Sequence, residues 1–392
     1  MNMRAIILLI SVFIILENSI AQKNICTESI NTFAFRLLEQ LQNNKENCFY
    51  SPFSVFDALS MTYSGSKENT KMEFEKVLDI QSGGNIHQNL LELSNDLGLE
   101  RDFTFLSSNS LWLQKSLKPE KNFIKNAEEE YKAKIENVDF SGEHDREKAR
   151  TQINEWVEKQ TKGNLLNFIP KGILDESTIM LIVNAVYYNA GWLTEFDSDK
   201  ITSDFFKVSS NDSVKCQMMN LRFETNYFED ENMQVIEIPY QNKKSSMLVF
   251  LPKKNGGFNS RIFNYDYYKK ISGQLINQEV RLSFPKFKMA VNYELAEYLK
   301  KMGLKSAFEP GADFSGITGN KSLMLDKILH KSVIDVSEKG TEAASSTGVI
   351  SMRSTKIEKQ LVGFIADRPF YFIIKQNAGS LILFMGYLSR PE

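Results

Sequence analysis

The sequence predicts an α+β fold, because a helix-rich first part is followed by a strand-rich second part. Up to about residue 167, apolar residues recur mainly at helical spacing. From about residue 235 onward, short apolar runs rich in Val, Ile and Phe end at Pro, Gly or Asn, as strands do. One of them, Ile328 to Val336, alternates so regularly that it predicts a long strand. No linker rich in Pro, Ser or Gly separates the two parts.

Residues 1–21 have the features of a secretory signal. Arg4 precedes an apolar run from Ala5 to Leu16, and small residues at Ser19 and Ala21 stand where a signal peptidase cleaves. The run is shorter than the roughly 20 residues that a membrane span requires, and no later stretch is long enough. We therefore expect a secreted, extracellular protein whose mature chain begins near Gln22.

Two helices are predicted early in the mature chain. Apolar residues between Ile30 and Leu41 recur every three or four positions, which predicts an amphipathic helix. A second helix should follow Ser51 and Pro52, because Ser is a good N-cap and Pro suits the first helical position.

Two further helices complete the first part. Residues Glu68 to Leu78 predict a helix capped by Asn69 or Thr70, since both side chains can accept a hydrogen bond from the first turn. Residues Arg146 to Asn167 place a few apolar side chains among many charges, which predicts a surface helix.

The second part is predicted to be mainly strands, with one helix from Tyr293 to Met302. The last two strands should pair as a buried hairpin across Gln376 to Ser380. The predicted strands are Val235–Tyr240, Ser245–Leu251, Val280–Phe287, Phe370–Ile374 and Leu381–Tyr387.

A segment rich in small residues follows the strand that ends at Val336. It comprises Glu338, Lys339, Gly340, Thr341, Glu342, Ala343, Ala344, Ser345, Ser346 and Thr347. This run has too little bulk to anchor a core and no Pro to exclude it from a sheet, so it can form either a loop or a strand. A buried strand resumes at Phe364, so this loop is tethered to sheet at both ends.

Four ordered blocks of this sequence resemble the serpin family. They are the Glu-x-Gly-Thr-Glu-Ala-Ala hinge with a Phe-x-Ala-Asp-Arg-Pro-Phe segment after it, Asn47–Ser54, Asn184–Trp192 and Asp326–Lys331. The resemblance implies one domain over residues 22–392, with three β-sheets, eight or nine helices and an exposed reactive-centre loop at about 338–363.

The sequence gives little sign of an enzyme. Its three histidines, His87, His144 and His330, are dispersed, and no zinc, nucleotide-binding or nucleophile motif occurs. We therefore expect no catalytic residues, no metal and no cofactor. His330, on a strand beside Leu329, is predicted to be a hydrogen-bonded structural residue rather than a base.

The resemblance also implies roles for five residues near the main sheet. His330 falls in the family's shutter with Ser51, Ser54 and Asn184, where the central strands part, and we interpret these four as a polar latch. Trp192 belongs to the adjoining breach.

The function implied by the resemblance is inhibition of a serine protease, with a covalent acyl complex trapped when the cleaved loop inserts as a strand. In such a strand Thr341, Ala343, Ser345 and Thr347 would face one side and Glu342, Ala344 and Ser346 the other. The first set is small and uncharged, so it suits the core. A non-inhibitory serpin acting as a carrier is the alternative, although residues Ala343 to Thr347 of the hinge include none of the bulky, charged or Pro residues of such members.

The scissile bond has two predicted positions. The family's usual spacing from Glu338 gives Ser354–Thr355, which suits an elastase-like target. Side-chain chemistry favours Arg353–Ser354, because Arg fits the acidic specificity pocket of trypsin-like proteases, and Lys356 is a third candidate.

Other sequence features bear on location and partners. The odd cysteine count, Cys26, Cys48 and Cys216, leaves at least one thiol without a partner in this chain. A Cys26–Cys48 bridge is one alternative, and buried free thiols are favoured. Asn211 and Asn320 begin glycosylation sequons. With a net charge of −2 and no dense basic patch, nucleic acid is not expected as a partner, and glycosaminoglycan activation has no support. The protein is expected to be a monomer.

Overall fold

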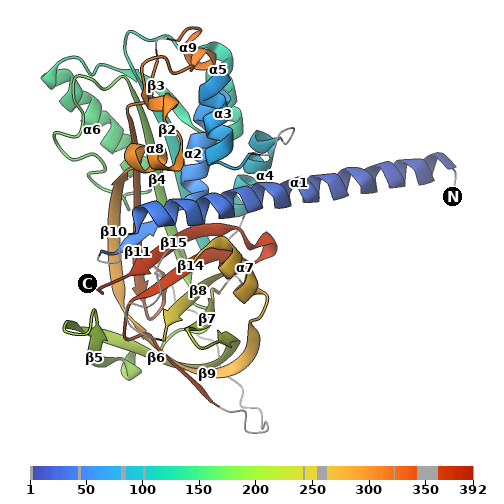
Figure 1. Cartoon of the computed structure of the whole chain (residues 1–392), viewed down its shortest axis with the longest axis vertical. Coiled ribbons are helices and arrows are strands. Elements are labelled where there is room, and N and C mark those ends of the chain that lie inside the picture. Colours follow the sequence, from blue (N-terminus) through green and yellow to red (C-terminus); the bar gives the residue numbers. More distant parts are fainter. Residues whose placement is uncertain are drawn as a thin grey trace.

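The computed structural model describes residues 3–42, 46–80, 85–99, 103–241, 243–253, 263–321, 323–341 and 361–391, with side chains from residue 21 onward (Figure 1). Nine α-helices lie in these ranges: α1 (Met3–Leu41), α2 (Pro52–Ser64), α3 (Glu68–Val77), α4 (Ile86–Gly98), α5 (Lys121–Tyr131), α6 (Glu143–Gln160), α7 (Tyr265–Ser272), α8 (Ala296–Met302) and α9 (Ser315–Thr318). The strands are β1 (Cys48–Tyr50), β2 (Phe103–Gln114), β3 (Lys134–Val138), β4 (Met180–Gly191), β5 (Thr202–Lys207), β6 (Ser213–Glu229), β7 (Met233–Pro239), β8 (Ser245–Pro252), β9 (Ile276–Pro285), β10 (Phe287–Glu294), β11 (Lys327–Ser337), β12 (Gly340–Thr341), β13 (Val362–Ile365), β14 (Phe370–Gln376) and β15 (Ile382–Leu388).

Hydrogen bonds join the described strands into a six-stranded and a nine-stranded sheet. The six-stranded sheet has the order β10-β11-β12-β4-β2-β3. The other runs β1-β15-β14-β8-β7-β6-β9-β13, with β5 added on β6. The long strand β6 pairs with β5 at its start and with β7 at its end, so two of the three expected sheets share strands and appear as one.

Two apolar clusters cover the two faces of the six-stranded sheet. Figure 1 shows α6 on one side of the upright strands β2 and β4, and α2 on the other. Ile153 and Val157 of α6 pack on Trp112 and Leu181 of the sheet in the smaller cluster. The α2 side joins the main core, which continues into the nine-stranded sheet. An inserting strand would therefore have to pass between two packed layers.

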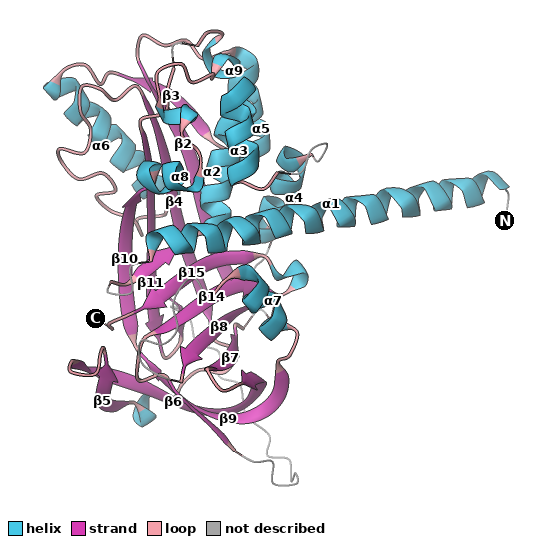
Figure 2. Ribbon diagram, viewed as in Figure 1, coloured by secondary structure: helices cyan, strands magenta, loops and turns pink. Residues whose placement is uncertain are grey.

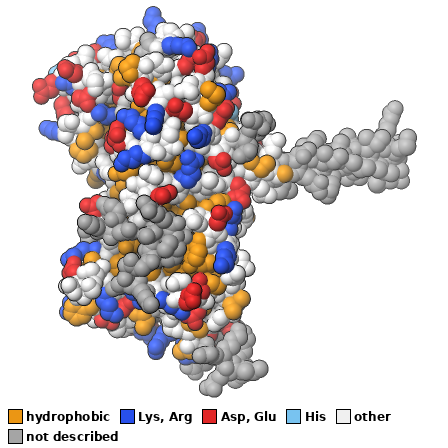
Figure 3. Space-filling view, in the orientation of Figure 1, with side chains coloured by type: hydrophobic (Ala, Val, Ile, Leu, Met, Phe, Trp, Pro, Cys, Tyr) orange, Lys and Arg blue, Asp and Glu red, His pale blue; other side chains and the backbone are white. Residues whose placement is uncertain are grey.

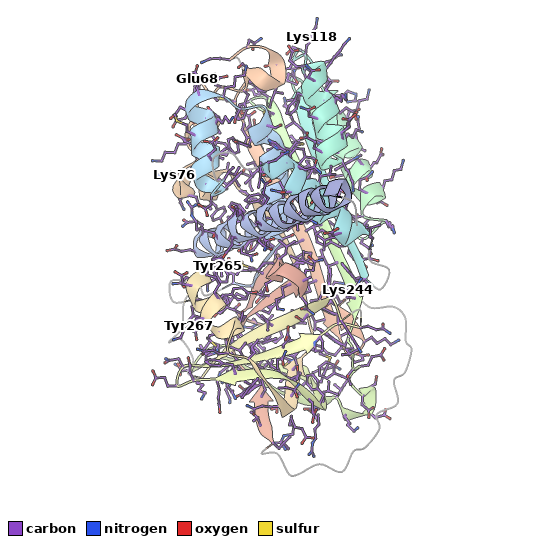
Figure 4. The ribbon with its side chains drawn as sticks, turned by 90° about the vertical axis from the view of Figure 1, so that its right-hand side faces the viewer. Glu68, Lys76, Lys118, Lys244, Tyr265 and Tyr267 are labelled. Atoms are coloured by element: carbon purple, nitrogen blue, oxygen red, sulfur yellow. The ribbon has the colours of Figure 1, made fainter. Side chains whose placement is uncertain are left out.

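Helices and strands concentrate at opposite ends of the molecule (Figure 2). Seen from the side in Figure 4, α3 with Glu68 and Lys76 lies above α1, whereas Tyr265 and Tyr267 of α7 lie below it. The N-terminal half of α1 extends away from the rest of the molecule (Figure 1). The predicted α+β class is confirmed.

The predicted N-cap of α2 agrees with the structure, whereas that of α3 does not. Ser51 caps α2, and its Oγ accepts a hydrogen bond from the backbone N–H of Ser54 at 3.2 Å. The predicted cap of α3 is wrong: Lys67 occupies that position without a side-chain bond. Thr70 instead accepts a hydrogen bond from the backbone N–H of Asp313, in a distant loop.

Two boundaries also differ from the prediction. The surface helix α6 begins at Glu143 and ends at Gln160, since Lys162 and Gly163 have left-handed backbone angles of 53° and 82° in φ. The single strand predicted from Val280 to Phe287 is two strands, β9 and β10, which belong to different sheets and separate at Lys286.

Candidate functional site

The junction between β11 and β4 is closed along the half from Lys327 to Val333, which we call the lower half, and open at the end next to Gly340, which we call the upper end. In the orientation of Figure 1 the upper end points downward, toward β5 and β6. From Lys327 to Val333, β11 pairs directly with Leu181 to Tyr187 in parallel. Above that, β12 lies between the two strands. Gly340 and Thr341 pair antiparallel with Ser337 and Val336 of β11, and also with Gly191 and Ala190 of β4. Two residues of the predicted hinge, Gly340 and Thr341, are thus already strand, and the turn before them is formed by Glu338 and Lys339.

Thr341 faces the core side of the sheet. Its side chain is 1% exposed, and its Oγ1 lies 2.8 Å from the hydroxyl of Tyr240. The Tyr240 ring stacks on Trp192, with centroids 4.7 Å apart and planes 9° apart. The buried side chains of Tyr240 and Trp192 therefore lie beneath Thr341 on the core side of the sheet.

The hinge backbone is held by the same region. The backbone N–H of Trp192 donates to the carbonyl of Lys339, and that of Phe196 donates to the carbonyl of Glu338, both at 2.9 Å. Gly340 has a φ of 152°, which favours glycine at this bend. The carboxylate of Glu338 lies 2.7 Å from the ammonium of Lys286, and this hydrogen bond lowers the pKa of Glu338.

The four residues of the predicted latch lie together. The backbone N–H of Ser51 donates to Nε2 of His330 at 3.2 Å, so the ring proton sits on Nδ1, 2.5 Å from Oδ1 of Asn184. Asn184 in turn donates to the Oγ of Ser54 at 2.6 Å. His330 is completely buried, and burial lowers its pKa to about 3, so the ring is neutral. Because His330 and Asn184 are directly paired on β11 and β4, this bond crosses the junction.

Two members of this network were missed by sequence analysis. Asn109 of β2 sits directly opposite Asn184 and accepts a hydrogen bond from it at 2.5 Å. Asn109 then donates to Oδ2 of Asp57 at 2.7 Å. A signal for Asp57 was present, since it is the only charged residue of α2 and follows Ser51 and Ser54 at three-residue steps on one helix face.

A cavity of about 740 Å³ lies over the outer face of the junction. It is lined by β11 and β4 and by the segment that follows α6, including Leu166. The ammonium of Lys331 on β11 donates to the carbonyl of Leu166 at 2.9 Å, which ties this segment to the sheet. The lining from the sheet comprises Tyr187, Asn189, Lys288, Ala290, Lys331, Val333, Asp335 and Ser337.

Several predicted site residues fall outside the described residues. They are the distal hinge and the predicted scissile bonds: Glu342, Ala343, Ala344, Ser345, Ser346, Thr347, Arg353, Ser354 and Thr355. Asn211 and Asn320 are described and exposed. Cys26, Cys48 and Cys216 are free thiols, as favoured from the sequence, and burial raises the pKa of Cys26 and Cys48 to about 12.

Comparison with known proteins identifies the family. Residues 28–391 match the family model described as serpin (serine protease inhibitor). The chain belongs to the serpin family. Serpin B6 of Pongo abelii is 34% identical over 94% of this chain and all of its own length. A leukocyte elastase inhibitor of Bos taurus is 33% identical over 89% of this chain and 94% of its own.

The fold comparison includes a serpin named as a binding protein. The crystal structure of human thyroxine-binding globulin with its ligand has a TM-score of 0.86 and 28% identity, and the match covers 94% of this chain and 99% of that one. The serpin family thus contains relatives named for inhibition and relatives named for binding. Among the described residues, no group of side chains could hold a metal ion, and no helix is long and apolar enough to cross a bilayer.

Proposed function

We propose that this serpin is a secreted inhibitor that traps serine proteases by inserting its cleaved loop between β11 and β4. The observation that carries the proposal is the antiparallel pairing of Gly340 and Thr341 with both strands. To complete the insertion, the loop would only have to extend this strand in the same register. Thr341, the first side chain of the core-facing set, is small, uncharged and buried, as that set requires.

The register of β12 predicts where each later residue would go. Six residues beyond Thr341, Thr347 would lie six residues before Val336 and Ala190, which places it between His330 and Asn184. These two residues now bond to each other across the junction. Entry would therefore exchange the latch bond for contacts with the Thr347 hydroxyl, a group that both donates and accepts.

The outward-facing set matches the cavity in the same way. In this register, Glu342 would lie between Asp335 and Asn189, and Ala344 between Val333 and Tyr187. Those four partners line the cavity over the junction, so the new side chains would enter space that already exists. Lys288, which pairs with Asp335 at 3.3 Å, is the cation available to Glu342.

The energetics favour completion once the loop is cut. Continuing the register brings Ile350 opposite Lys327 and Leu181, the lower ends of both strands. About ten newly paired residues, at roughly 1 kcal/mol of net hydrogen-bond energy each, give on the order of 10 kcal/mol. Both candidate scissile bonds lie three or four residues beyond Ile350. The acyl-linked protease would thus be carried to the lower end of the sheet.

The proposed target is a trypsin-like protease that cleaves Arg353–Ser354, with an elastase-like protease cleaving Ser354–Thr355 as the alternative. Incubation with trypsin and with elastase, followed by denaturing electrophoresis, tests both. An inhibitor gives a detergent-resistant complex, and the mass of the released C-terminal fragment identifies the bond. Arg353→Ala should abolish the complex with trypsin while keeping any complex with elastase.

A binding protein is the second candidate, since thyroxine-binding globulin is similar in fold. A carrier would be cleaved by the same proteases without forming a complex. The heat stability of the cleaved product tests insertion independently, because only an inserted loop adds a strand to the sheet. Cleavage with neither complex nor stabilisation would refute the inhibitory proposal.

Secretion is proposed from the signal at residues 1–21. The family match starts only at residue 28, and the N-terminal half of α1 extends away from the molecule (Figure 1). Exposure of Asn211 and Asn320 suits glycosylation on a secretory route. Sequencing of protein exported from cells should find Gln22 at its N-terminus.

We also propose that the protein acts as a monomer and needs no polyanion to activate it. Figure 3 shows basic and acidic side chains interspersed on the visible face.

A further inference from the structure

The latch is one end of a longer chain of hydrogen bonds that runs across three strands into α2. His330, Asn184 and Asn109 stand side by side on β11, β4 and β2. Beneath them, Ser51, Ser54 and Asp57 follow one another along one face of the capped helix α2. Asp57 is 6% exposed and ends the row at the β2 side.

Every bond in this chain points in the same direction. Because Ser51 donates to Nε2 of His330, the imidazole must donate from Nδ1 to Oδ1 of Asn184. The Asn184 Nδ2 is a donor, and it donates to Oδ1 of Asn109 as well as to Ser54. The Asn109 amide in turn donates to Oδ2 of Asp57. Hydrogen bonds aligned in this way polarise one another, and an ionised final acceptor strengthens each of them.

We propose that Asp57 is a positioning residue for loop entry, because its carboxylate ends this one-way chain and its ionisation sets how tightly β11 is held to β4. The inference deepens the proposed function and rests on it for its consequence, since separation of these strands is the step that admits the loop. Within this hydrogen-bond chain, the His330–Asn184 bond is the one that crosses the junction, beside the backbone pairing of the two strands, so Asp57 acts on that bond through Asn109 and Asn184.

The surroundings of Asp57 allow it to titrate near neutral pH. Burial raises its pKa to about 8, against the hydrogen bond from Asn109 and the charge of Lys132 at the end of α5. The other titratable groups that face it are the thiol of Cys26 on α1 and the hydroxyl of Tyr131 on α5. Burial raises the pKa of Cys26 to about 12 and that of Tyr131 well above its usual value, so both stay neutral between pH 6 and 9. His330 is also neutral throughout that range.

The sign of the effect distinguishes this role from a purely structural one. The folded-state pKa of Asp57 lies above the value of 3.8 for a free side chain, so its burial lowers the free energy of unfolding as pH rises toward 8. A buried acid with no link to the latch would therefore loosen the fold generally at higher pH. The chain predicts the opposite change at one place: protection of the β11–β4 junction should increase as Asp57 ionises.

Native-state amide hydrogen exchange measures this directly in the intact protein. Protection of the amides of residues 327–333, corrected for intrinsic exchange, is followed from pH 6.5 to 9. We expect a rise of about two- to fivefold with a midpoint near pH 8, and no such rise in β14, which lies in the other sheet. In Asp57→Asn, which keeps the shape but cannot ionise, the rise should disappear.

Three further variants make the outcome decisive. Asp57→Ser, also unable to ionise, replaces Asp57→Asn if the amide disturbs folding. Asn109→Ser keeps the acid but breaks the chain, and should also lose the rise. Glu130→Gln removes another acid whose pKa burial raises, one that lies on α5 and outside the hydrogen-bond chain, and should keep the rise. Flat or falling wild-type protection, or an unchanged rise in Asp57→Asn, would overturn the inference. Complex formation with trypsin is scored separately, so a protein with the rise but without the complex refutes only the proposed inhibition.

Discussion

The upper and lower halves of the β11–β4 junction are held by different chemistry. In the upper half, Thr341 fills the gap and rests on the stacked rings of Tyr240 and Trp192. In the lower half, the strands pair directly and a polar chain through His330 and Asn184 crosses between them. The upper half is already in the arrangement that insertion would extend, whereas the lower half must break and remake bonds. In the proposed mechanism the latch, rather than the hinge, would therefore be the barrier to loop entry.

Thr341→Arg should have the largest effect, because it breaks the upper half. A buried, unpaired charge at this position costs several kcal/mol, enough to expel the hinge from between the strands. Slow entry gives the acyl bond time to hydrolyse, so the protein should be cleaved as a substrate with at least a tenfold lower yield of covalent complex. Electrophoresis after incubation with trypsin measures that yield.

Thr341→Val is the matched control for this substitution. It keeps the shape and loses only the bond to Tyr240, worth about 1 kcal/mol. The valine variant should form the complex at close to the wild-type yield. An arginine variant that does the same would show that the hinge need not be buried.

The lower half should respond to acid through His330. Its folded pKa of about 3 lies below its ordinary value of 6.5, so between these pH values the unfolded chain binds a proton that the folded protein does not. Stability from this residue is complete above pH 6.5 and is lost as pH falls toward 3, by roughly a few kcal/mol in all. Urea denaturation midpoints between pH 4 and 7 should therefore decline less steeply in His330→Gln.

His144→Gln provides the control for this pH dependence. His144 is exposed at the start of α6, so its replacement should leave the acid slope unchanged. His330→Gln also changes the denaturation midpoint at every pH, so the test compares only how steeply the midpoint declines as pH falls. Equal slopes in wild type and His330→Gln would mean that the latch histidine is not the group that titrates.

The same two halves show what the sequence could and could not predict. The alternation of Ile328 to Val336 predicted β11 correctly, because one face of a half-buried strand must be apolar. Ser51 as a cap was equally local. By contrast, Asn109, Asp57 and Tyr240 come to the site from β2, α2 and the end of β7, far from His330 or Thr341 in sequence. No short-range pattern encodes such pairings, so part of the latch came from the resemblance. For the rest, the one local signal was the spacing of Asp57 from Ser51 and Ser54.

Tyr240→Phe sharpens the comparison by removing one hydroxyl from the upper half. The phenyl ring keeps its stacking on Trp192, while Oγ1 of Thr341 loses its partner at a cost of about 1 kcal/mol. We expect a complex yield close to that of Thr341→Val, which loses the same bond, and no change in latch stability. The stoichiometry of inhibition of trypsin measures this yield, and Tyr265→Phe on α7 serves as a control remote from the junction. A loss as large as that of Thr341→Arg would contradict the small role given to this bond.

The smallest effect is expected from the ion pair between Glu338 and Lys286. Both side chains are partly exposed, 22% and 31%, so solvent screens the pair and its worth should be below about 1 kcal/mol. The ion pair nevertheless tests the upper half, because Glu338 belongs to the hinge and its backbone carbonyl also accepts a hydrogen bond from Phe196. Glu338→Gln should lower the melting temperature by no more than about 2 °C, and the exchanged pair Glu338→Lys with Lys286→Glu should restore part of that loss. Lys288→Met, which removes the neighbouring pair with Asp335, supplies the comparison for a lysine outside the hinge. If Glu338→Gln instead abolished complex formation while the exchanged pair recovered it, electrostatics rather than backbone pairing would hold the hinge in place.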